Sequence, residues 1–389
     1  MKDQLLKIYN TTEIKDNQNH VSPYKIKLNF DGGAKVDVVS KFDKNEKFKI
    51  SFFDNFRKEL IYSDTIGSNM WCGASKKYYC DWEVQVETLN SNKTKKINFD
   101  LKGKKVKISN ESPSLGDCIA WTAVIEDFQK KHNCKVDYFT PFSDIFKNQY
   151  KSINIKPYKQ KYNNEDYYVS YQIGYFFDDK SMTPFDPRER GLQELACDIL
   201  GLDFVEKPPK IFIENPERPI KEKYVCISTS STAGCKHWQN KGGWQKVVDY
   251  LNNLGYKVVV IQKESLTFMD LEGLDNVLHP ETKNIQEAIT WLANCEFYIG
   301  LGSGISWLSW ALRKKVVMIS GFSKPFAEFS NPYRVINANV CNGCWNNLNH
   351  KFNAKDWNWC PEGKNFECSK EISFEMVQEK IDNCIQFLN

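Results

Sequence analysis

Long apolar runs are absent from this sequence. No window holds the roughly 18 consecutive apolar residues that a membrane-spanning helix needs, so we expect no transmembrane helix. The first residues, MKDQLLKIYNTTEIKDNQ, lack the continuous apolar stretch of a secretory signal peptide. Both absences predict a cytoplasmic protein, in which the 13 cysteines stay mostly reduced. Their odd number and irregular spacing also argue against a disulfide framework.

An excess of charge of one sign is lacking as well. The chain has 53 Lys and Arg against 49 Asp and Glu, a net charge of +4. So small a net charge argues against a nucleic-acid-binding protein, which would carry a strongly basic surface. Neither GxGxxG nor a GKS/GKT signature occurs, which argues against a dinucleotide site and a P-loop. The five histidines form no HExxH or other recognisable catalytic arrangement.

The 389 residues suggest two or three domains, and 14% aromatic residues exclude global disorder. Alternating runs at 24–30, 34–40, 47–54 and 82–89 predict an antiparallel β-sandwich or barrel. A strand, loop, helix and strand then follow over 106–140 and predict a βαβ unit in a parallel sheet. The predicted units are a β module at 1–100, an α/β half at 101–206, a proline-rich linker at 207–220, a second α/β half at 221–336, a four-cysteine finger at 337–370 and a terminal helix at 371–389.

Asp117 is the candidate catalytic residue. It lies in SPSLGDCIAW, at the predicted junction between a strand and a helix, directly after Gly116. A loop there delivers a side chain to the cleft between the two halves, and a carboxylate in that place can take a proton from a substrate hydroxyl. The alternative is a helix N-cap, a position that favours Asp.

Two loops of the second half are candidates for phosphate recognition. STSSTAGCKHW offers the hydroxyls of Ser231 and Thr232 and the ammonium of Lys236. GLGSGISWL places small residues between a strand and a helix, where free N–H groups form an anion site. The residues of this second loop are Gly302, Ser303 and Gly304. Although each loop alone is also typical of a plain turn, the pair favours a nucleotide-sugar donor.

Four cysteines near the end of the chain suggest a metal site. Cys341 and Cys344 form a CxxC pair. Fifteen residues separate Cys344 from Cys360, and seven more separate Cys360 from Cys368. Four thiolates suit tetrahedral zinc or a rubredoxin-like iron, and they fill the coordination sphere, so the site is expected to be structural. Four ordinary buried thiols, or redox chemistry at the CxxC pair, are the alternatives. His350 lies between the cysteine pairs as a spare ligand.

A family resemblance enters through the motifs LGDCIAW, STAGCKHW and GLGSGISWLSWAL. Together they resemble the heptosyltransferases that use ADP-heptose, including the lipopolysaccharide enzymes. One departure is clear, because those enzymes carry Asp where this chain has Gly302. The whole chain, with its β module, KYYCDWEVQV and the four-cysteine finger, more specifically resembles the bacterial autotransporter heptosyltransferases.

This resemblance implies an α/β GT-B fold with two Rossmann-like halves, an N-terminal all-β module and the four-cysteine finger. It implies that Asp117 is the base and that the two loops bind the diphosphate of ADP-heptose. It further implies one iron ion per subunit, with zinc as the alternative, and a dodecameric homo-oligomer. The acceptors would be serines of an autotransporter adhesin, modified in the cytoplasm. The alternatives are transfer to lipopolysaccharide core and a metal-stabilised inactive scaffold. The sequence leaves the role of the segment PFDPRER, at 184–190, unassigned.

Overall fold

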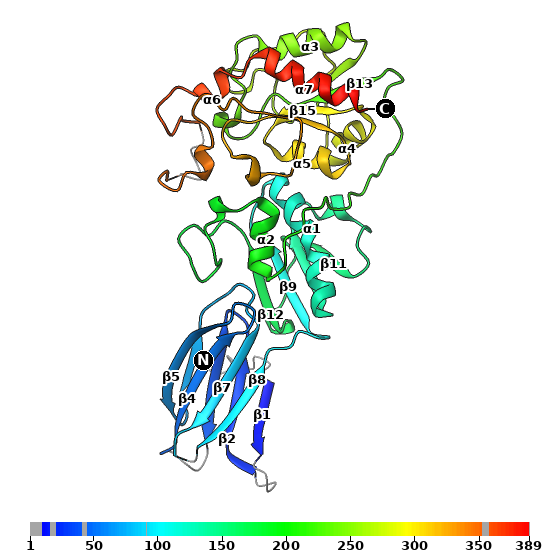
Figure 1. Ribbon diagram of the computed structural model, residues 1–389. Coiled ribbons are helices and arrows are strands. Elements are labelled where there is room, and N and C mark those ends of the chain that lie inside the picture. The colour runs from blue at the N-terminus through cyan, green and yellow to red at the C-terminus, as the bar shows by residue number, and fades with distance from the viewer. Residues whose placement is uncertain (1–9, 16–20, 41–44, 91, 352–357, 389) are drawn as a thin grey trace.

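Three regions follow one another along the molecule. The computed structural model describes residues 10–15, 21–40, 45–90, 92–351 and 358–388. An all-β region comes first, and two regions built around parallel sheets are stacked beyond it (Figure 1). Within these described residues, no helix is long and apolar enough to cross a membrane. The chain therefore has a mixed α/β fold with an all-β N-terminal region, as predicted.

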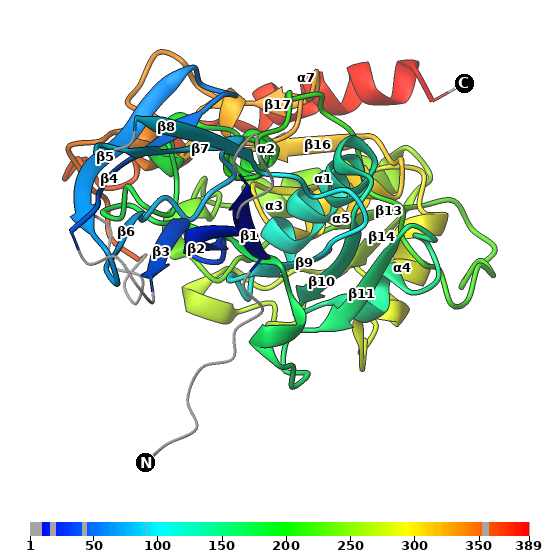
Figure 2. The ribbon, with the colours of Figure 1, turned by 90° about the horizontal axis from the view of Figure 1, so that it is seen from below.

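The N-terminal region consists of two four-stranded antiparallel sheets that form two layers (Figure 2). Their orders are β1-β2-β3-β6 and β5-β4-β7-β8. Buried and half-buried residues alternate along β3 and β7, and the rings of Tyr24 and Phe48 meet between the sheets at 4.9 Å. The strands are β1 (Asn10–Lys15), β2 (Val21–Asn29), β3 (Ala34–Ser40), β4 (Lys47–Asp54), β5 (Glu59–Gly67), β6 (Trp71–Ala74), β7 (Trp82–Thr88) and β8 (Lys93–Asn98).

The first α/β region has four parallel strands in the order β11-β10-β9-β12. Its elements are β9 (Lys105–Asn110), α1 (Leu115–His132), β10 (Lys135–Thr140), β11 (Ile153–Pro157), β12 (Val169–Ile173) and α2 (Leu192–Leu200). The βαβ unit β9–α1–β10 is the one that the sequence predicts. However, α1 has Ser114 as its N-cap, so Asp117 lies in the first helical turn. Both the loop position and the N-cap alternative for Asp117 are therefore wrong.

The second α/β region has five parallel strands in the order β14-β13-β15-β16-β17. Its elements are β13 (Tyr224–Ile227), α3 (Gly243–Asn253), β14 (Lys257–Val260), α4 (Ile285–Asn294), β15 (Tyr298–Leu301), α5 (Gly304–Ala311), β16 (Val316–Ile319) and β17 (Arg334–Val335). β13, β15 and β16 are buried throughout, which explains their continuous apolar sequences. Residues 207–220 connect the two α/β regions without a helix or strand.

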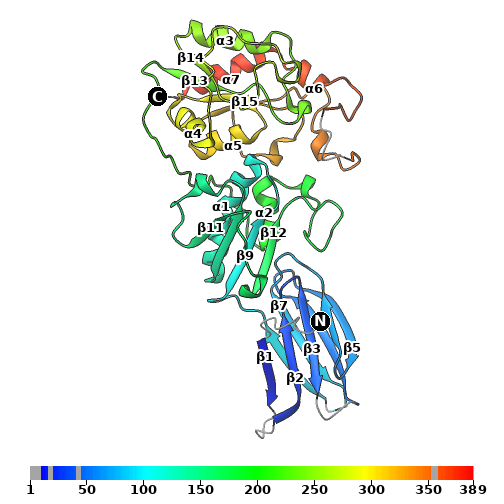
Figure 3. The same cartoon turned by 180° about the vertical axis from the view of Figure 1, so that it is seen from behind.

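The last helices return to the second α/β region. A short helix, α6 (Glu367–Lys370), ends the cysteine-containing segment, and α7 (Phe374–Gln386) follows it. α7 packs against α3 and β16 on the side of the molecule far from the β region (Figures 1 and 3). Val377, Ile381 and Cys384 are its buried residues, so this helix completes the core of the second region.

Candidate active site

A cavity of about 400 Å³ lies between the two α/β regions. The first turn of α1 lines it from one side, and the loops after β13, β15 and β16 line it from the other. Six of the seven residues predicted for catalysis and donor binding line this cavity: Asp117, Thr232, Lys236, Gly302, Ser303 and Gly304. The seventh, Ser231, is absent from its lining. Residues far apart in the sequence thus meet at the carboxyl ends of the parallel strands, the usual place for ligands in α/β folds.

Two glycines allow the regions to approach each other at the cavity. A Cβ atom on Gly304, the first residue of α5, would lie 2.9 Å from Leu115 Cβ and 3.1 Å from the Gly116 backbone nitrogen. A Cβ atom on Gly116 would lie 3.2 Å from Trp307 Cδ1. The N-termini of α1 and α5 therefore meet closely enough that larger residues need a shift of the backbone. Gly304, which the sequence predicts for phosphate contact, also serves this packing.

Asp117 is buried, and both of its carboxylate oxygens accept hydrogen bonds. The Ser112 hydroxyl donates to Oδ2 at 2.5 Å, and the Tyr175 hydroxyl donates to Oδ1 at 3.0 Å. Burial raises the pKa of Asp117, while these two hydrogen bonds and the positive charge of Lys236 oppose the rise. The net direction is upward, which makes this carboxylate a stronger base than an exposed one. The effect of Lys236 also shows that its ammonium acts across the cavity on Asp117.

The loop after β13 presents Thr232 and Lys236 to the cavity but turns Ser231 inward. The Ser231 hydroxyl donates to the Ala233 carbonyl at 2.8 Å, and its backbone N–H donates to His237 Nε2 at 3.1 Å. Burial lowers the pKa of His237, which favours the neutral ring that this hydrogen bond requires. Ser231 and His237 therefore shape the loop, and Thr232 and Lys236 are left to meet a ligand.

Sequence reasoning missed the aromatic and acidic part of the cavity. Tyr175, Phe177 and Trp345 pack against one another there, with ring centroids 5.6–6.0 Å apart, and Glu328 adds a second carboxylate. No local motif marks these residues, because they come from three separate loops. The one available signal was Gly302, where a carboxylate expected from the related enzymes is missing.

The segment 184–190, whose role the sequence left unassigned, belongs to the first α/β region. It forms hydrogen bonds with the cysteine segment, residues 337–370. Arg188 Nη1 donates to the His350 carbonyl at 2.7 Å, and Asn346 Nδ2 donates to the Arg188 carbonyl at 2.6 Å. Asp186 holds the same guanidinium in an ion pair of 3.0 Å. The segment does not line the cavity, so its observed contacts are structural.

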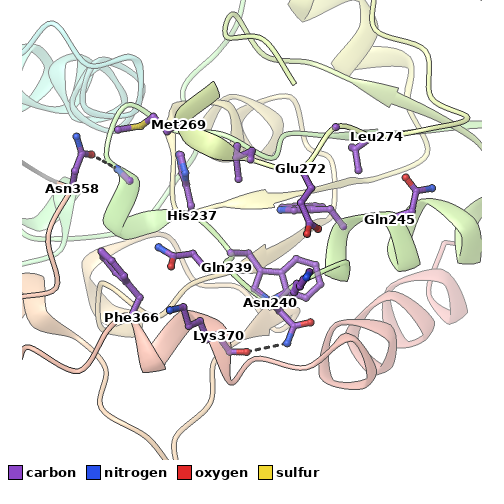
Figure 4. Close-up of a pocket in the computed structure, with 16 residues that line it drawn as sticks. His237, Gln239, Asn240, Gln245, Met269, Glu272, Leu274, Asn358, Phe366 and Lys370 are labelled. Atoms are coloured by element: carbon purple, nitrogen blue, oxygen red, sulfur yellow. Dashed lines mark hydrogen bonds between the residues drawn. The ribbon is translucent and has the colours of Figure 1, made fainter. Parts of the chain in front are cut away.

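The cysteine segment also supports the loop after β13. Asn358 Oδ1 accepts from the Gly234 N–H at 2.9 Å, and Asn240 Nδ2 donates to the Lys370 carbonyl at 2.9 Å. Figure 4 shows both hydrogen bonds at the edge of a second cavity, of about 560 Å³, which the continuation of this loop lines together with Asn358, Phe366 and Lys370. A structural change in the cysteine segment is therefore expected to shift the residues of this loop that line the cavity between the two α/β regions.

Three of the four candidate metal ligands affect the pKa of the fourth. Burial raises the pKa of Cys368 to about 12, and the charges of Cys341, Cys344 and Cys360 contribute to the rise. In the part of the chain that the structure describes, however, the group of possible ligands with donor atoms within 4.8 Å of one another is Cys344, His350 and Glu362. Residues 352–357, between the cysteine pairs, lie outside the described residues. The chemistry of the segment suits a metal, while its ligand set stays a prediction.

Known proteins resemble this chain over part or most of its length. Residues 196–357 match glycosyltransferase family 9 (heptosyltransferase). The chain is 36% identical over 366 residues to the autotransporter heptosyltransferase Aah of Escherichia coli, with 90% of each chain covered. It is also 31% identical over 367 residues to the inactive autotransporter heptosyltransferase BimC of Burkholderia thailandensis, with 88% of this chain and 85% of that one covered.

A solved structure matches nearly the whole chain. It is the dodecameric, iron-containing heptosyltransferase TibC of enterotoxigenic Escherichia coli, in complex with ADP-D-β-D-heptose. The alignment covers 98% of this chain and 99% of TibC, with a TM-score of 0.82 and 30% identity. The likeness thus includes the all-β region and the cysteine segment as well as the two α/β regions.

Proposed function

This chain belongs to the autotransporter heptosyltransferases, and we propose that it transfers heptose from ADP-heptose to serine hydroxyls of an autotransporter adhesin in the cytoplasm. The observation that carries this proposal is the shared cavity, which unites a buried carboxylate from α1 with a lysine and a helix N-terminus from the second α/β region. A transferase for a nucleotide sugar needs both parts, a base for the acceptor and positive groups for the diphosphate.

Asp117 acts as the general base in this proposal. A serine hydroxyl is a weak nucleophile at neutral pH and needs a base. As the serine oxygen attacks the anomeric carbon of the heptose, Asp117 accepts its proton. The raised pKa of Asp117 suits this step, and the hydrogen bonds from Ser112 and Tyr175 hold the carboxylate in one orientation.

The second α/β region stabilises the leaving group. When the bond between sugar and phosphate breaks, negative charge grows on the β-phosphate of ADP. The Lys236 ammonium, the Thr232 hydroxyl and the free N–H groups at the start of α5 face the cavity where that charge forms. The small residues Ser303 and Gly304 allow the diphosphate to approach these N–H groups, whereas the space beside Gly302 holds the Glu328 carboxylate. In this arrangement the fold is GT-B, with the donor bound to the second Rossmann-like half and the base supplied by the first.

The cysteine segment holds one structural iron ion in this proposal, with Cys341, Cys344, Cys360 and Cys368 as ligands and zinc as the alternative metal. Four thiolates are a donor set that suits one iron or zinc ion, and the charges of Cys341 and Cys360 act on both Cys344 and Cys368. An iron ion there fixes the fold of the segment and, through Asn358, the donor loop. We extend the proposal to a dodecameric assembly, the state in which TibC crystallised.

An inactive scaffold is the second candidate, and the relative named as inactive is the observation that favours it. The presence of Asp117, Thr232 and Lys236 in one cavity favours an active enzyme. Transfer to lipopolysaccharide core is less favoured, because the relatives matched over most of the chain are named for autotransporters.

Intact mass of a co-expressed autotransporter passenger tests the proposal. In cells that make ADP-heptose, the passenger should gain increments of one heptose residue when this protein is present. Release by β-elimination would locate the sugar on serine. An unchanged passenger mass, with the protein folded and ADP-heptose present, would contradict protein heptosylation and favour the scaffold.

A further inference from the structure

Glu328 is a buried carboxylate that the proposed mechanism does not use. Its side chain and that of Arg334 are each 7% exposed, and Arg334 Nη2 forms a close ion pair with Glu328 Oε2. The Ser323 hydroxyl donates to Oε1 at 3.1 Å. A buried charge is costly unless it is paired and hydrogen-bonded, and here both conditions are met. The carboxylate is therefore a fixed acceptor on the wall of the cavity.

The position of this carboxylate depends on Gly302. A Cβ atom on Gly302 would lie 2.2 Å from Glu328 Oε1, far closer than atoms can approach. A side chain at residue 302 and the carboxylate of residue 328 therefore compete for one space. A carboxylate at residue 302 would therefore occupy the space that Glu328 fills from a different loop.

We propose that Glu328 recognises the sugar of the donor by accepting hydrogen bonds from hydroxyls of the transferred heptose. This inference rests on the proposed function. A carboxylate has no donor for a phosphate and repels its charge, whereas sugar hydroxyls are its natural partners. Lys236 and the N-terminus of α5 offer the diphosphate a better place in the same cavity.

Tyr175 lies in the same cavity as both Asp117 and Glu328, which relates Glu328 to the proposed base. The Tyr175 hydroxyl donates to Asp117 Oδ1 at 3.0 Å. Burial raises the pKa of Tyr175, and the negative charges of Asp117 and Glu328 raise it further. Both carboxylates therefore lie within electrostatic reach of one ring. Asp117 and Glu328 line the same cavity, so a donor whose anomeric carbon meets the proposed base Asp117 would bring its sugar within reach of Glu328. Arg334 balances its charge, so the cavity still accepts an anionic donor.

Paired binding measurements with ADP and ADP-heptose test this role. Glu328→Gln keeps the shape of the side chain and one oxygen for Arg334, but it removes the charge. ADP-heptose affinity should fall about tenfold or more, the range for hydrogen bonds to charged groups, while ADP affinity stays within twofold. Glu206→Gln is the control, because Glu206 contacts the same loop through the Ser330 N–H and does not line the cavity. Equal losses for both ligands, or no loss for either, would overturn the role in sugar recognition.

A second pair of variants distinguishes loss of sugar recognition from misfolding. Glu328→Ala should lose ADP-heptose affinity and melt at a lower temperature, because it leaves Arg334 buried without its partner. Combining Glu328→Ala with Gly302→Asp returns a carboxylate to the same space, and the preference for ADP-heptose over ADP should recover. A double variant that binds ADP like the wild type but shows no such recovery would overturn the proposal. A wild-type protein that does not prefer ADP-heptose would instead contradict the proposed function itself.

Discussion

The two α/β regions line the same cavity with different chemical groups. The first region contributes the carboxylate of Asp117, the proposed base, and both of its oxygens accept hydrogen bonds from hydroxyl groups. The second contributes backbone N–H groups, glycines and the flexible side chain of Lys236. The first arrangement fixes a proton acceptor and raises its pKa. The second allows a large anionic ligand to approach the backbone.

This difference gives each region its own kinetic signature. Changes in the network around Asp117 should act on the rate of transfer and on its pH dependence. Changes in the second region should act on donor affinity as well as on the departure of ADP. The same holds for changes in the cysteine segment, which supports the loop after β13. Variants in each region can separate the two roles or show that they cannot be separated.

Asp117→Asn should have the largest effect on transfer. The amide keeps the size of the side chain but cannot accept the serine proton. We expect kcat to fall about 10²–10⁴-fold, the usual contribution of a general base. Glu126→Gln is the control, since Glu126 belongs to the same helix and pairs with Lys130 away from the cavity. Transfer by the Asp117 variant at the wild-type rate would remove this residue from the mechanism.

The same variant has a distinct effect on stability. Because the pKa of Asp117 is higher in the folded protein than in the unfolded chain, its stabilising contribution is present at low pH and is lost as the pH rises through the folded pKa. Asp117→Asn should therefore not lower the melting temperature at neutral pH. Thermal denaturation between acidic and neutral pH will show whether this holds.

Cys341→Ser should remove the metal and weaken the assembly. A structural metal contributes directly to folding, so we expect little bound metal, a lower melting temperature and weaker donor binding. Elemental analysis and size-exclusion chromatography report these changes. Cys72→Ala, at a buried thiol of the β region, should retain the metal. His350→Ala tests the alternative ligand set, and loss of metal from this variant but not from Cys341→Ser would contradict the four-cysteine site.

Lys236→Ala should weaken donor binding and slow departure of ADP. Loss of one hydrogen bond to a charged group corresponds to about 10–100-fold in the affinity for ADP-heptose and for ADP. Lys241→Ala is the matched control, because Lys241 is an exposed lysine that lines the second cavity. If ADP bound equally well to both variants, the diphosphate would not lie beside Lys236.

Tyr175→Phe should have a smaller effect and should change the pH profile. Its hydroxyl opposes the rise in the Asp117 pKa that burial causes, so its loss should raise that pKa further. The acidic limb of kcat should therefore move to higher pH, with a rate change below about tenfold at the optimum. Tyr158→Phe removes a similar hydroxyl-to-carboxylate contact, with Glu111, outside the cavity. If the acidic limb of the pH profile stayed in place, the Tyr175 hydroxyl would not control the pKa of the catalytic base.

Much of the fold was accessible from the sequence, because local patterns carry it. Alternation at 34–40 and 82–89 marks β3 and β7, whose buried faces are regular. β5 and β8 are mostly exposed, and their apolar patterns were too weak to predict strands at 59–67 and 93–98. The start of α1 was predicted three residues late, because Leu115 and Gly116 belong to the helix through their packing against α5.

The site was accessible only where a motif carries it. Asp117 and Lys236 belong to short recognisable segments, and the fold brings them together. Glu328 and Tyr175 enter the cavity through non-local packing, so no spacing in the sequence reveals them. The inward orientation of Ser231 also depends on a buried hydrogen bond to His237, which the motif does not show.

Calorimetric measurement of ADP-heptose binding to Asp117→Asn tests most directly whether the first region supplies the base and the second binds the donor. We expect this variant to bind ADP-heptose as tightly as the wild type and to transfer almost none of the heptose to a passenger peptide. Loss of donor affinity as large as that of Lys236→Ala would contradict the separation, because Asp117 would then belong to the donor site.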